Sequence, residues 1–209
     1  MIRVRPRPEP LEFDARVRQP GRRWLVSHPN GRPRDYWTRC KVALAEAFEH
    51  RCGYLAIRLH SSGEVDHFVS CDEDRASAYE WSNYRYCDSQ LNKRKSKLAA
   101  ARLLDPFEVE DGWFELSDPD LRLEVTDLCP PELRQRARDT IRRLRLDDDD
   151  EIIKDRRYWV NAYESGVNLA LIEREAPLVA ACSGAARRRG GDPRAMNPAC
   201  SSSATSCGS

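Results

Sequence analysis

The sequence predicts an α+β protein, with short strands in the first half of the chain and helices toward its end. Two short apolar runs flank a Ser-Ser-Gly turn at residues 61–63, and runs of this kind favour strands. A second β signal surrounds Asp111 and Gly112, a dipeptide typical of hairpin turns. From Pro130 onward, apolar residues recur at helical spacing instead. We therefore expect a small β-containing core with appended helices.

Length and composition limit the class of protein. A chain of 209 residues suits one domain with added segments. Charged residues make up 33% of the chain and the mean hydropathy is −0.72, with no apolar run long enough to span a membrane. Residues 1–8 lack the apolar core of a signal peptide. We therefore expect a cytoplasmic protein that does not associate with membranes.

The charges are unevenly distributed along the chain, although the net charge is only +1. Residues 1–40 contain ten arginines and four acidic residues, whereas residues 105–127 contain nine acidic residues and one arginine. A basic face is typical of proteins that bind nucleic acid. The alternative interpretation is an ordinary solvated surface.

The first elements are an arm and a helix. Residues 1–36 are rich in proline and arginine, and we expect an extended arm with Trp24 and Leu25 as anchor points. A helix is predicted at about 35–50 from apolar residues at helical spacing, namely Trp37, Leu44 and Phe48.

Short strands and a basic helix follow. We expect the strands at residues 52–60, 64–70 and 81–86. The helix is predicted at 88–98, where Asp88 or Ser89 can cap its N-terminus.

The second half begins with a predicted hairpin and continues as helices. The hairpin pairs 107–110 with 113–116, and a further strand is expected at 121–125 because its apolar residues alternate. Three helices are expected, at 131–145, 148–164 and 168–182. Residues 183–209 have almost no large apolar side chains, which predicts a disordered tail.

One ordered set of polar residues carries the functional prediction. Asp66 and His67 are adjacent, Asn83 follows sixteen residues after His67, and Asn92 follows nine residues later on the basic helix. Four basic residues come directly after Asn92, namely Lys93, Arg94, Lys95 and Lys97. This order resembles the motif of HNH (ββα-metal) endonucleases over about residues 52–98.

The resemblance implies an architecture for the chain. The family folds two strands and a helix around one divalent ion, so residues 37–104 would form an HNH nuclease core behind the 1–36 arm. Residues 105–182 would add a β-hairpin and a helical part, and 183–209 the disordered tail.

The resemblance also implies roles that agree with the chemistry of phosphodiester hydrolysis. The Asp66 carboxylate and the Asn92 amide are oxygen ligands of the kind that suits Mg²⁺ or Mn²⁺. His67 points to the opposite face of its strand, where it can act as general base. Asn83 would hold the hairpin and orient the His67 ring. The basic residues after Asn92 would contact phosphates of the nucleic acid.

The cysteines depart from the family pattern. Many HNH proteins hold a structural zinc with two C-x-x-C pairs, but here Leu55 and Gln90 stand where Cys52 and Cys87 would have partners. Two thiolates do not complete a tetrahedral zinc site, so we expect no structural zinc. None of the eight cysteines lies in a C-x-x-C pair, and we expect buried, reduced thiols.

The wider sequence resembles the HNH nuclease component of Septu-type anti-phage defence systems. The shared features are a Pro-rich start at residues 5–10, Asp-His-Phe at 66–68 and Tyr-Glu-Trp-Ser-Asn-Tyr at 79–84. This resemblance implies an ATPase partner and a role in antiviral defence. We therefore predict a magnesium-dependent DNA endonuclease. Two alternatives stay open: an inactive nucleic-acid-binding or assembly subunit, and a nuclease that acts on RNA.

Overall fold

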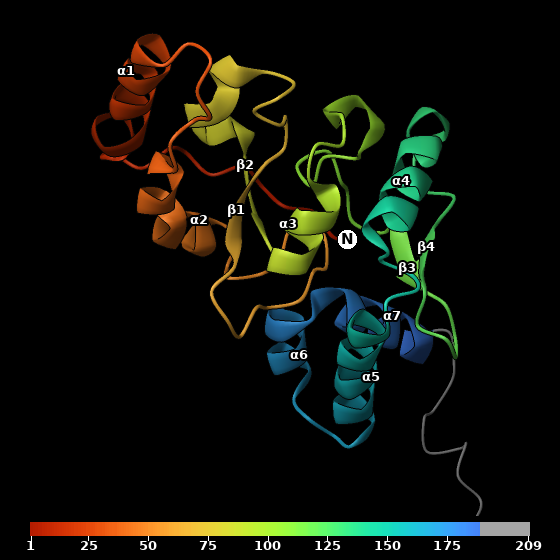
Figure 1. Ribbon diagram of the computed structural model, residues 1–209. Coiled ribbons are helices and arrows are strands. Elements are labelled where there is room, and N and C mark those ends of the chain that lie inside the picture. The colour runs from red at the N-terminus through yellow and green to blue at the C-terminus, as the bar shows by residue number, and fades with distance from the viewer. Residues whose placement is uncertain (189–209) are drawn as a thin grey trace, which may run out of the picture.

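A computed structural model describes residues 1–188, and its elements confirm a mixed α+β architecture (Figure 1). The α-helices are α1 (Gln19–Ser27), α2 (Lys41–Ala47), α3 (Ser89–Lys95), α4 (Pro131–Leu144), α5 (Asp150–Glu164), α6 (Leu169–Glu175) and α7 (Pro177–Arg188). The strands are β1 (Glu64–His67), β2 (Tyr84–Cys87), β3 (Phe114–Leu116) and β4 (Leu123–Val125). Short 3₁₀ segments lie at Tyr36–Cys40, Arg75–Tyr79, Trp81–Asn83 and Ala100–Arg102. No helix in this part of the chain is both long and apolar enough to cross a membrane.

The central sheet consists of β1 and β2, which run antiparallel with Glu64 opposite Cys87 and His67 opposite Tyr84. Figure 1 shows this sheet between α2 and α3. Because successive side chains of a strand point to opposite faces, Glu64 and Asp66 share one face and His67 lies on the other. The basic helix predicted at 88–98 is confirmed as α3.

The strand predicted at 52–60 is wrong. In this segment the structure has turns, and the bridge between Arg51 and Arg58 is its one β-type pairing. The apolar residues of the segment are buried, with Tyr54 0% exposed, and Ala56 has a positive φ of 56° that interrupts an extended chain. The run is therefore apolar because it fills the core, and β1 pairs with β2 instead.

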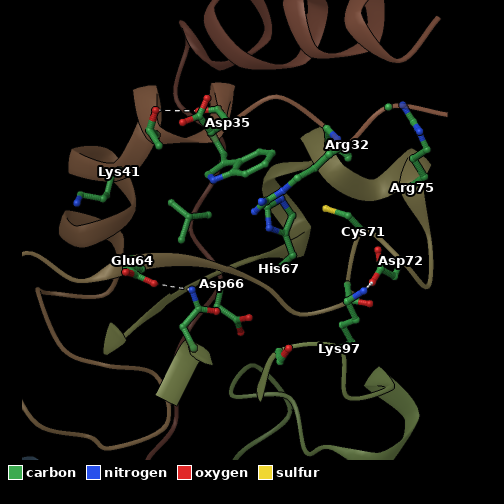
Figure 2. Close-up of a pocket in the computed structure, with 18 of the residues that line it drawn as sticks. Arg32, Asp35, Lys41, Glu64, Asp66, His67, Cys71, Asp72, Arg75 and Lys97 are labelled. Carbon is green, nitrogen blue, oxygen red and sulfur yellow. Dashed lines mark hydrogen bonds and ion pairs between the residues drawn. The ribbon is translucent and has the colours of Figure 1, made fainter. Parts of the chain in front are cut away.

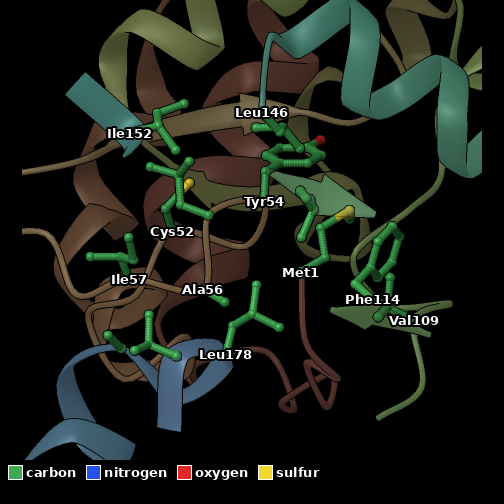
Figure 3. Packing of buried hydrophobic residues seen from close by; sticks show 14 of the residues in the cluster. Met1, Cys52, Tyr54, Ala56, Ile57, Val109, Phe114, Leu146, Ile152 and Leu178 are labelled. Atoms are coloured by element: carbon green, nitrogen blue, oxygen red, sulfur yellow. The ribbon is translucent and has the colours of Figure 1, made fainter. Parts of the chain in front are cut away.

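Two hydrophobic clusters hold the central sheet. One packs α2 and the chain before α1 against the sheet, and its members include Phe13, Val17, Leu44, Phe48, Val65, Tyr79 and Tyr84. The other joins the 52–57 segment to the C-terminal half of the chain (Figure 3). In that cluster Tyr54 and Ile57 lie with Phe114, Leu146 and Ile152. The sheet is thus supported from both halves of the chain.

The N-terminal arm is more helical than predicted. A π-helical turn at Asp14–Arg18 leads directly into α1, so only part of the 1–36 segment is extended. Leu25 packs against the first cluster, and the Trp24 indole donates a hydrogen bond of 3.2 Å to the Arg32 carbonyl. Both anchor residues therefore make contacts. The helix predicted at 35–50 is confirmed as a 3₁₀ turn followed by α2.

The second sheet differs from the predicted hairpin. Gly112 does form a turn, with φ of 85°, but residues 107–110 are not a strand. The partner of β3 is β4, with Phe114 opposite Val125. The strand predicted at 121–125 is confirmed in β4.

The C-terminal helices follow the prediction closely. The predicted helix 131–145 is α4, and 148–164 is α5, where the Asp149 side chain caps the N-terminus. The helix predicted at 168–182 is divided into α6 and α7 at Pro177. Helix α7 extends to Arg188, into the segment for which disorder was predicted. The rest of the predicted tail, 189–209, lies outside the described residues.

Helix α3 has well-defined ends. The Asp88 carboxylate accepts hydrogen bonds from the backbone N–H groups of Gln90 (2.8 Å) and Leu91 (3.2 Å), which is an N-cap. The helix ends at Ser96, whose φ of 42° and ψ of −117° lie in a region that only glycine adopts without strain. The strained serine also lines a cavity of about 1010 Å³.

We expect Ser96→Gly to stabilise the protein by about 1 kcal/mol, because glycine removes the strain at this position. Chemical denaturation measures the change. Ser165→Gly is the matched control, since Ser165 also ends a helix but has an ordinary φ of −75°. A Ser96→Gly variant that is no more stable than the Ser165→Gly variant contradicts the prediction.

Candidate active site

A cavity of about 1010 Å³ opens beside β1 (Figure 2). Its walls come from four parts of the chain: β1, α3 with the residues that follow it, residues 30–41, and residues 70–75. Three of the four predicted catalytic and metal-binding residues line this one cavity, namely Asp66, His67 and Asn92. The fourth, Asn83, is not among its lining residues.

Asp66 is buried, with 2% of its surface exposed. Its Oδ1 forms an ion pair of 2.9 Å with the Lys95 ammonium, and its Oδ2 accepts a 2.9 Å hydrogen bond from the Tyr54 hydroxyl. Burial and the nearby Asp66 carboxylate hold the pKa of Tyr54 well above its ordinary value, so this hydroxyl keeps its proton. A carboxylate accepts about four hydrogen bonds or metal contacts, so each oxygen keeps capacity for another partner.

Lys95 has a different environment from the one expected for a phosphate contact. It is 1% exposed, and its ammonium also donates a 2.6 Å hydrogen bond to the carbonyl of His67. The side chain therefore points from α3 into the sheet and connects Asp66 to the backbone of the next residue. A buried ammonium with two protein partners does not face a nucleic-acid backbone, so the contact predicted for Lys95 is corrected.

His67 is held by a backbone carbonyl and by aromatic rings. Its Nε2 lies 2.9 Å from the carbonyl oxygen of Ala78, which can only accept a hydrogen bond. The proton of the neutral ring is therefore on Nε2, and Nδ1 has a free lone pair. The rings of Trp37 and Tyr84 stand edge-on to it, at centroid distances of 4.6 and 5.1 Å. Burial lowers the pKa of His67 below its ordinary value, which keeps the ring neutral at pH 7.

Asn83 joins two segments of the chain that follow His67. Its Oδ1 accepts a 2.8 Å hydrogen bond from the N–H of Val69, and its Nδ2 donates to the carbonyls of Val69 (2.9 Å) and Ser77 (3.2 Å). Ser77 directly precedes Ala78, whose carbonyl bonds to the His67 ring. Asn83 thus fixes the backbone that orients the imidazole.

Asn92 reaches the cavity from α3. Its Nδ2 donates a 2.7 Å hydrogen bond to Oε2 of Glu64. Glu64 was not predicted as a site residue, although it lies two residues before Asp66 and therefore shares its face of the strand. That spacing was the signal that could have found it.

These side chains offer oxygen donors of the kind that Mg²⁺ prefers. Glu64, Asp66 and Asn92 supply two carboxylates and one amide oxygen, all hard oxygen donors. Within residues 1–188 no three His, Cys, Asp or Glu side chains gather as a metal-binding group. Mg²⁺ does not require such a group, because it commonly takes one or two carboxylates and completes its shell with water and substrate phosphate. The residues present therefore fit the ion.

The other basic residues of α3, and Lys97 just after it, are of two kinds. Lys93 and Lys97 are exposed, and Lys97 pairs with Asp72 at 2.6 Å. Arg94 instead binds the protein, through an ion pair with Asp149 and a 3.1 Å hydrogen bond to the Leu144 carbonyl. Arg94 therefore connects α3 to the segment that links α4 and α5.

The opposite wall of the cavity adds cationic residues that sequence reasoning missed. Arg32, Lys41 and Arg75 all line it, and Figure 2 shows Arg32 pointing toward His67. Arg75 donates hydrogen bonds to the carbonyls of Pro29 (2.8 Å) and His28 (2.6 Å), which fixes this wall. Their position depends on the tertiary fold, and no local pattern in the sequence indicates it.

Comparisons with known proteins give no family assignment. No family model matches the sequence, and no curated protein matches it either.

We expect the purified protein to contain no stoichiometric zinc. Cys52 and Cys87 lie together in the structure, but Leu55 and Gln90 offer no thiolates to complete a tetrahedral site. Elemental analysis of protein purified without chelator measures the zinc content. About one zinc per chain, retained after mild chelation, would contradict the prediction.

Proposed function

We propose that the protein is a metal-dependent endonuclease of the HNH type, which hydrolyses phosphodiester bonds of DNA. The proposal rests on one observation. Three residues line the same cavity, namely Asp66 and His67 from β1 and Asn92 from α3. Their order along the chain and their placement on a strand–strand–helix unit both agree with the resemblance to that family.

In this proposal the residues have separate roles. Asp66 and Asn92 would hold the divalent ion, with Glu64 as a further oxygen donor. When bound, the ion supplies positive charge to the scissile phosphate and the leaving oxygen. His67 takes a proton from the attacking water at its free Nδ1, and its Nε2–H stays on the Ala78 carbonyl. Asn83 keeps that carbonyl in place.

Binding of the nucleic acid is assigned to cations of α3, of the residues after it and of the opposite cavity wall. Lys93 and Lys97 on one side, and Arg32 and Lys41 on the other, can contact phosphates without leaving a buried partner unpaired. We extend the proposal to anti-phage defence with an ATPase partner, on the strength of the sequence resemblance.

The direct test incubates purified protein with supercoiled plasmid and, separately, with structured RNA, in Mg²⁺ or in EDTA. The proposal expects nicked or linear plasmid in Mg²⁺ and intact plasmid in EDTA. Cleavage of RNA alone would assign the site to an RNA-directed nuclease. Intact substrates in every condition, including Mn²⁺ and added cell extract, would overturn the nuclease proposal.

A second candidate function is an inactive assembly subunit, and one contact favours it. The Lys95 ammonium already neutralises Asp66 at 2.9 Å, so the carboxylate has a cation without any metal. Binding of plasmid with no cleavage in any metal would support this alternative.

Asn92→Ala tests the ligand assignment. Removal of outer partners of metal ligands already costs about 10–100-fold in metal affinity, so we expect loss of a ligand to raise the half-saturating Mg²⁺ concentration for cleavage by at least about 10-fold. Higher Mg²⁺ should restore much of the rate. Gln90→Ala, an exposed change on the same helix, is the control. An unchanged Mg²⁺ dependence of the Asn92→Ala variant would exclude Asn92 as a ligand.

A further inference from the structure

Two cysteines that are distant in the sequence, Cys52 and Cys87, lie close together in the structure. The Cys52 sulfur accepts a 3.4 Å hydrogen bond from the backbone N–H of Asp88, the residue that directly follows Cys87. The backbone N–H of Gly53 donates a 2.9 Å hydrogen bond to the Tyr86 carbonyl. These two contacts place residues 52 and 87 side by side. Both thiols are buried, at 1% and 0% exposure, and both are reduced in the structure.

The two sulfurs differ in acidity. Burial raises the pKa of Cys52, but hydrogen bonds from the Cys87 thiol and from backbone N–H groups outweigh burial and bring the pKa below its ordinary value. Burial, followed by the contact with Cys52, holds the pKa of Cys87 well above its ordinary value. Burial also raises the pKa of four other cysteines in the described part of the chain, namely Cys40, Cys71, Cys129 and Cys182. Among these six cysteines, Cys52 is therefore the one whose pKa is lowered, and the Cys87 thiol is its hydrogen-bond partner.

The pair is connected to the active site on both sides. Tyr54 follows Cys52 by two residues and donates its hydroxyl hydrogen to Asp66. Asp88 follows Cys87 and caps α3, the helix that carries Asn92. A bond between the two sulfurs would therefore tie the 52–57 segment to the start of α3.

We propose that Cys52 and Cys87 are a redox modification site, in which a peroxide converts the two thiols to a disulfide and cellular thiols reverse it. Buried cysteines of a cytosolic protein are ordinarily inert, and this pair departs from that rule because the Cys87 thiol donates a hydrogen bond to the Cys52 sulfur. The proposal is independent of the nuclease function.

The oxidation takes place in two balanced steps. The Cys52 thiolate attacks one oxygen of hydrogen peroxide, so that an S–O bond forms and the O–O bond breaks. The released hydroxide takes up the Cys52 proton and leaves as water. Next, the Cys87 sulfur attacks the Cys52 sulfur, so that the S–S bond forms and the S–O bond breaks. The second hydroxide leaves as water with the Cys87 proton. The two sulfurs lose two electrons in total, and the peroxide gains them.

The test treats the full-length, reduced protein with hydrogen peroxide under native conditions, followed by intact-mass measurement and peptide mapping without reductant. We expect the loss of two hydrogen atoms per chain, a cross-linked peptide that joins Cys52 to Cys87, and recovery of the original mass with dithiothreitol. Cys52→Ser and Cys87→Ser should each abolish the cross-link. Cys40→Ser, a buried cysteine in the other hydrophobic cluster, should retain it.

Three results would overturn the proposal. The first is a cross-link that joins other cysteines. The second is addition of oxygen at Cys52 without a cross-link. The third is no reaction of the folded wild-type protein at peroxide concentrations that oxidise the urea-unfolded chain. Because mapping of the wild-type protein decides among these results, a serine variant that fails to fold does not affect the test. Plasmid cleavage is not part of the readout, so failure of the nuclease proposal is a separate result.

Discussion

His67→Ala is expected to lower the rate of DNA cleavage about 10²–10⁴-fold, the usual cost of removing a general base. Binding of the nucleic acid should remain, because it depends on exposed Lys and Arg side chains that the substitution leaves in place. The metal ligands proposed on β1 and α3 also remain. The variant should therefore bind plasmid and Mg²⁺ but leave the water without a base.

Three measurements check this expectation together: plasmid cleavage under saturating Mg²⁺, plasmid binding in Ca²⁺ or EDTA, and thermal unfolding. His60→Ala is the matched control, since His60 is exposed and outside the cavity. Raised Mg²⁺ should not rescue His67→Ala, in contrast to Asn92→Ala. Cleavage by the His67→Ala variant at the wild-type rate would exclude the HNH mechanism. The inactive assembly subunit would then be the better proposal.

Lys95→Met is expected to destabilise the fold by about 3–5 kcal/mol, the typical cost of removing one partner from a buried ion pair. The methionine fills similar space, but Asp66 is left as a buried carboxylate without its cation. The double variant Asp66→Asn with Lys95→Met should recover most of the loss, because it leaves no buried charge unpaired.

Urea denaturation measures the free energy of unfolding of each variant. Lys93→Met is the control, an exposed lysine on the same helix, and it should stay within about 0.5 kcal/mol of the wild type. If Asp66 is a metal ligand, Mg²⁺ should stabilise Lys95→Met more than the wild type, since the ion then replaces the missing positive charge. A Lys95→Met variant as stable as the Lys93→Met variant would contradict the structural role of the ion pair.

Some of the fold was predictable from the sequence because its signals are local. The cap at Asp88 and the long apolar periodicity of α4 and α5 depend on residues within one helix, and these elements were predicted nearly at their observed bounds. Strand pairing is not local. The turn at Gly112 was identified, but the sequence around it does not indicate that β3 pairs with the more distant β4.

The candidate site was likewise predictable only where its signals are local. Because Asp66 and His67 are adjacent on a strand, their side chains point to opposite faces. This part of the geometry was therefore predictable from the sequence. The partner of Asp66 was not, because Lys95 resembles its basic neighbours in the sequence and differs from them only by facing inward. The same holds for Arg32, which the fold brings to the cavity from an arm far from the motif.

The ion pair between Asp66 and Lys95 also bears on the order of events after synthesis. In small zinc proteins the ligands repel one another or stay solvated until the metal arrives, so the chain remains unfolded without it. Here the buried carboxylate is matched by an ammonium from the same polypeptide, and the sheet and α3 can reach their final packing in a cell compartment depleted of divalent ions. Under the proposed function, folding and binding of the ion would then be separate events, and a chelator would remove the ion without unfolding the protein.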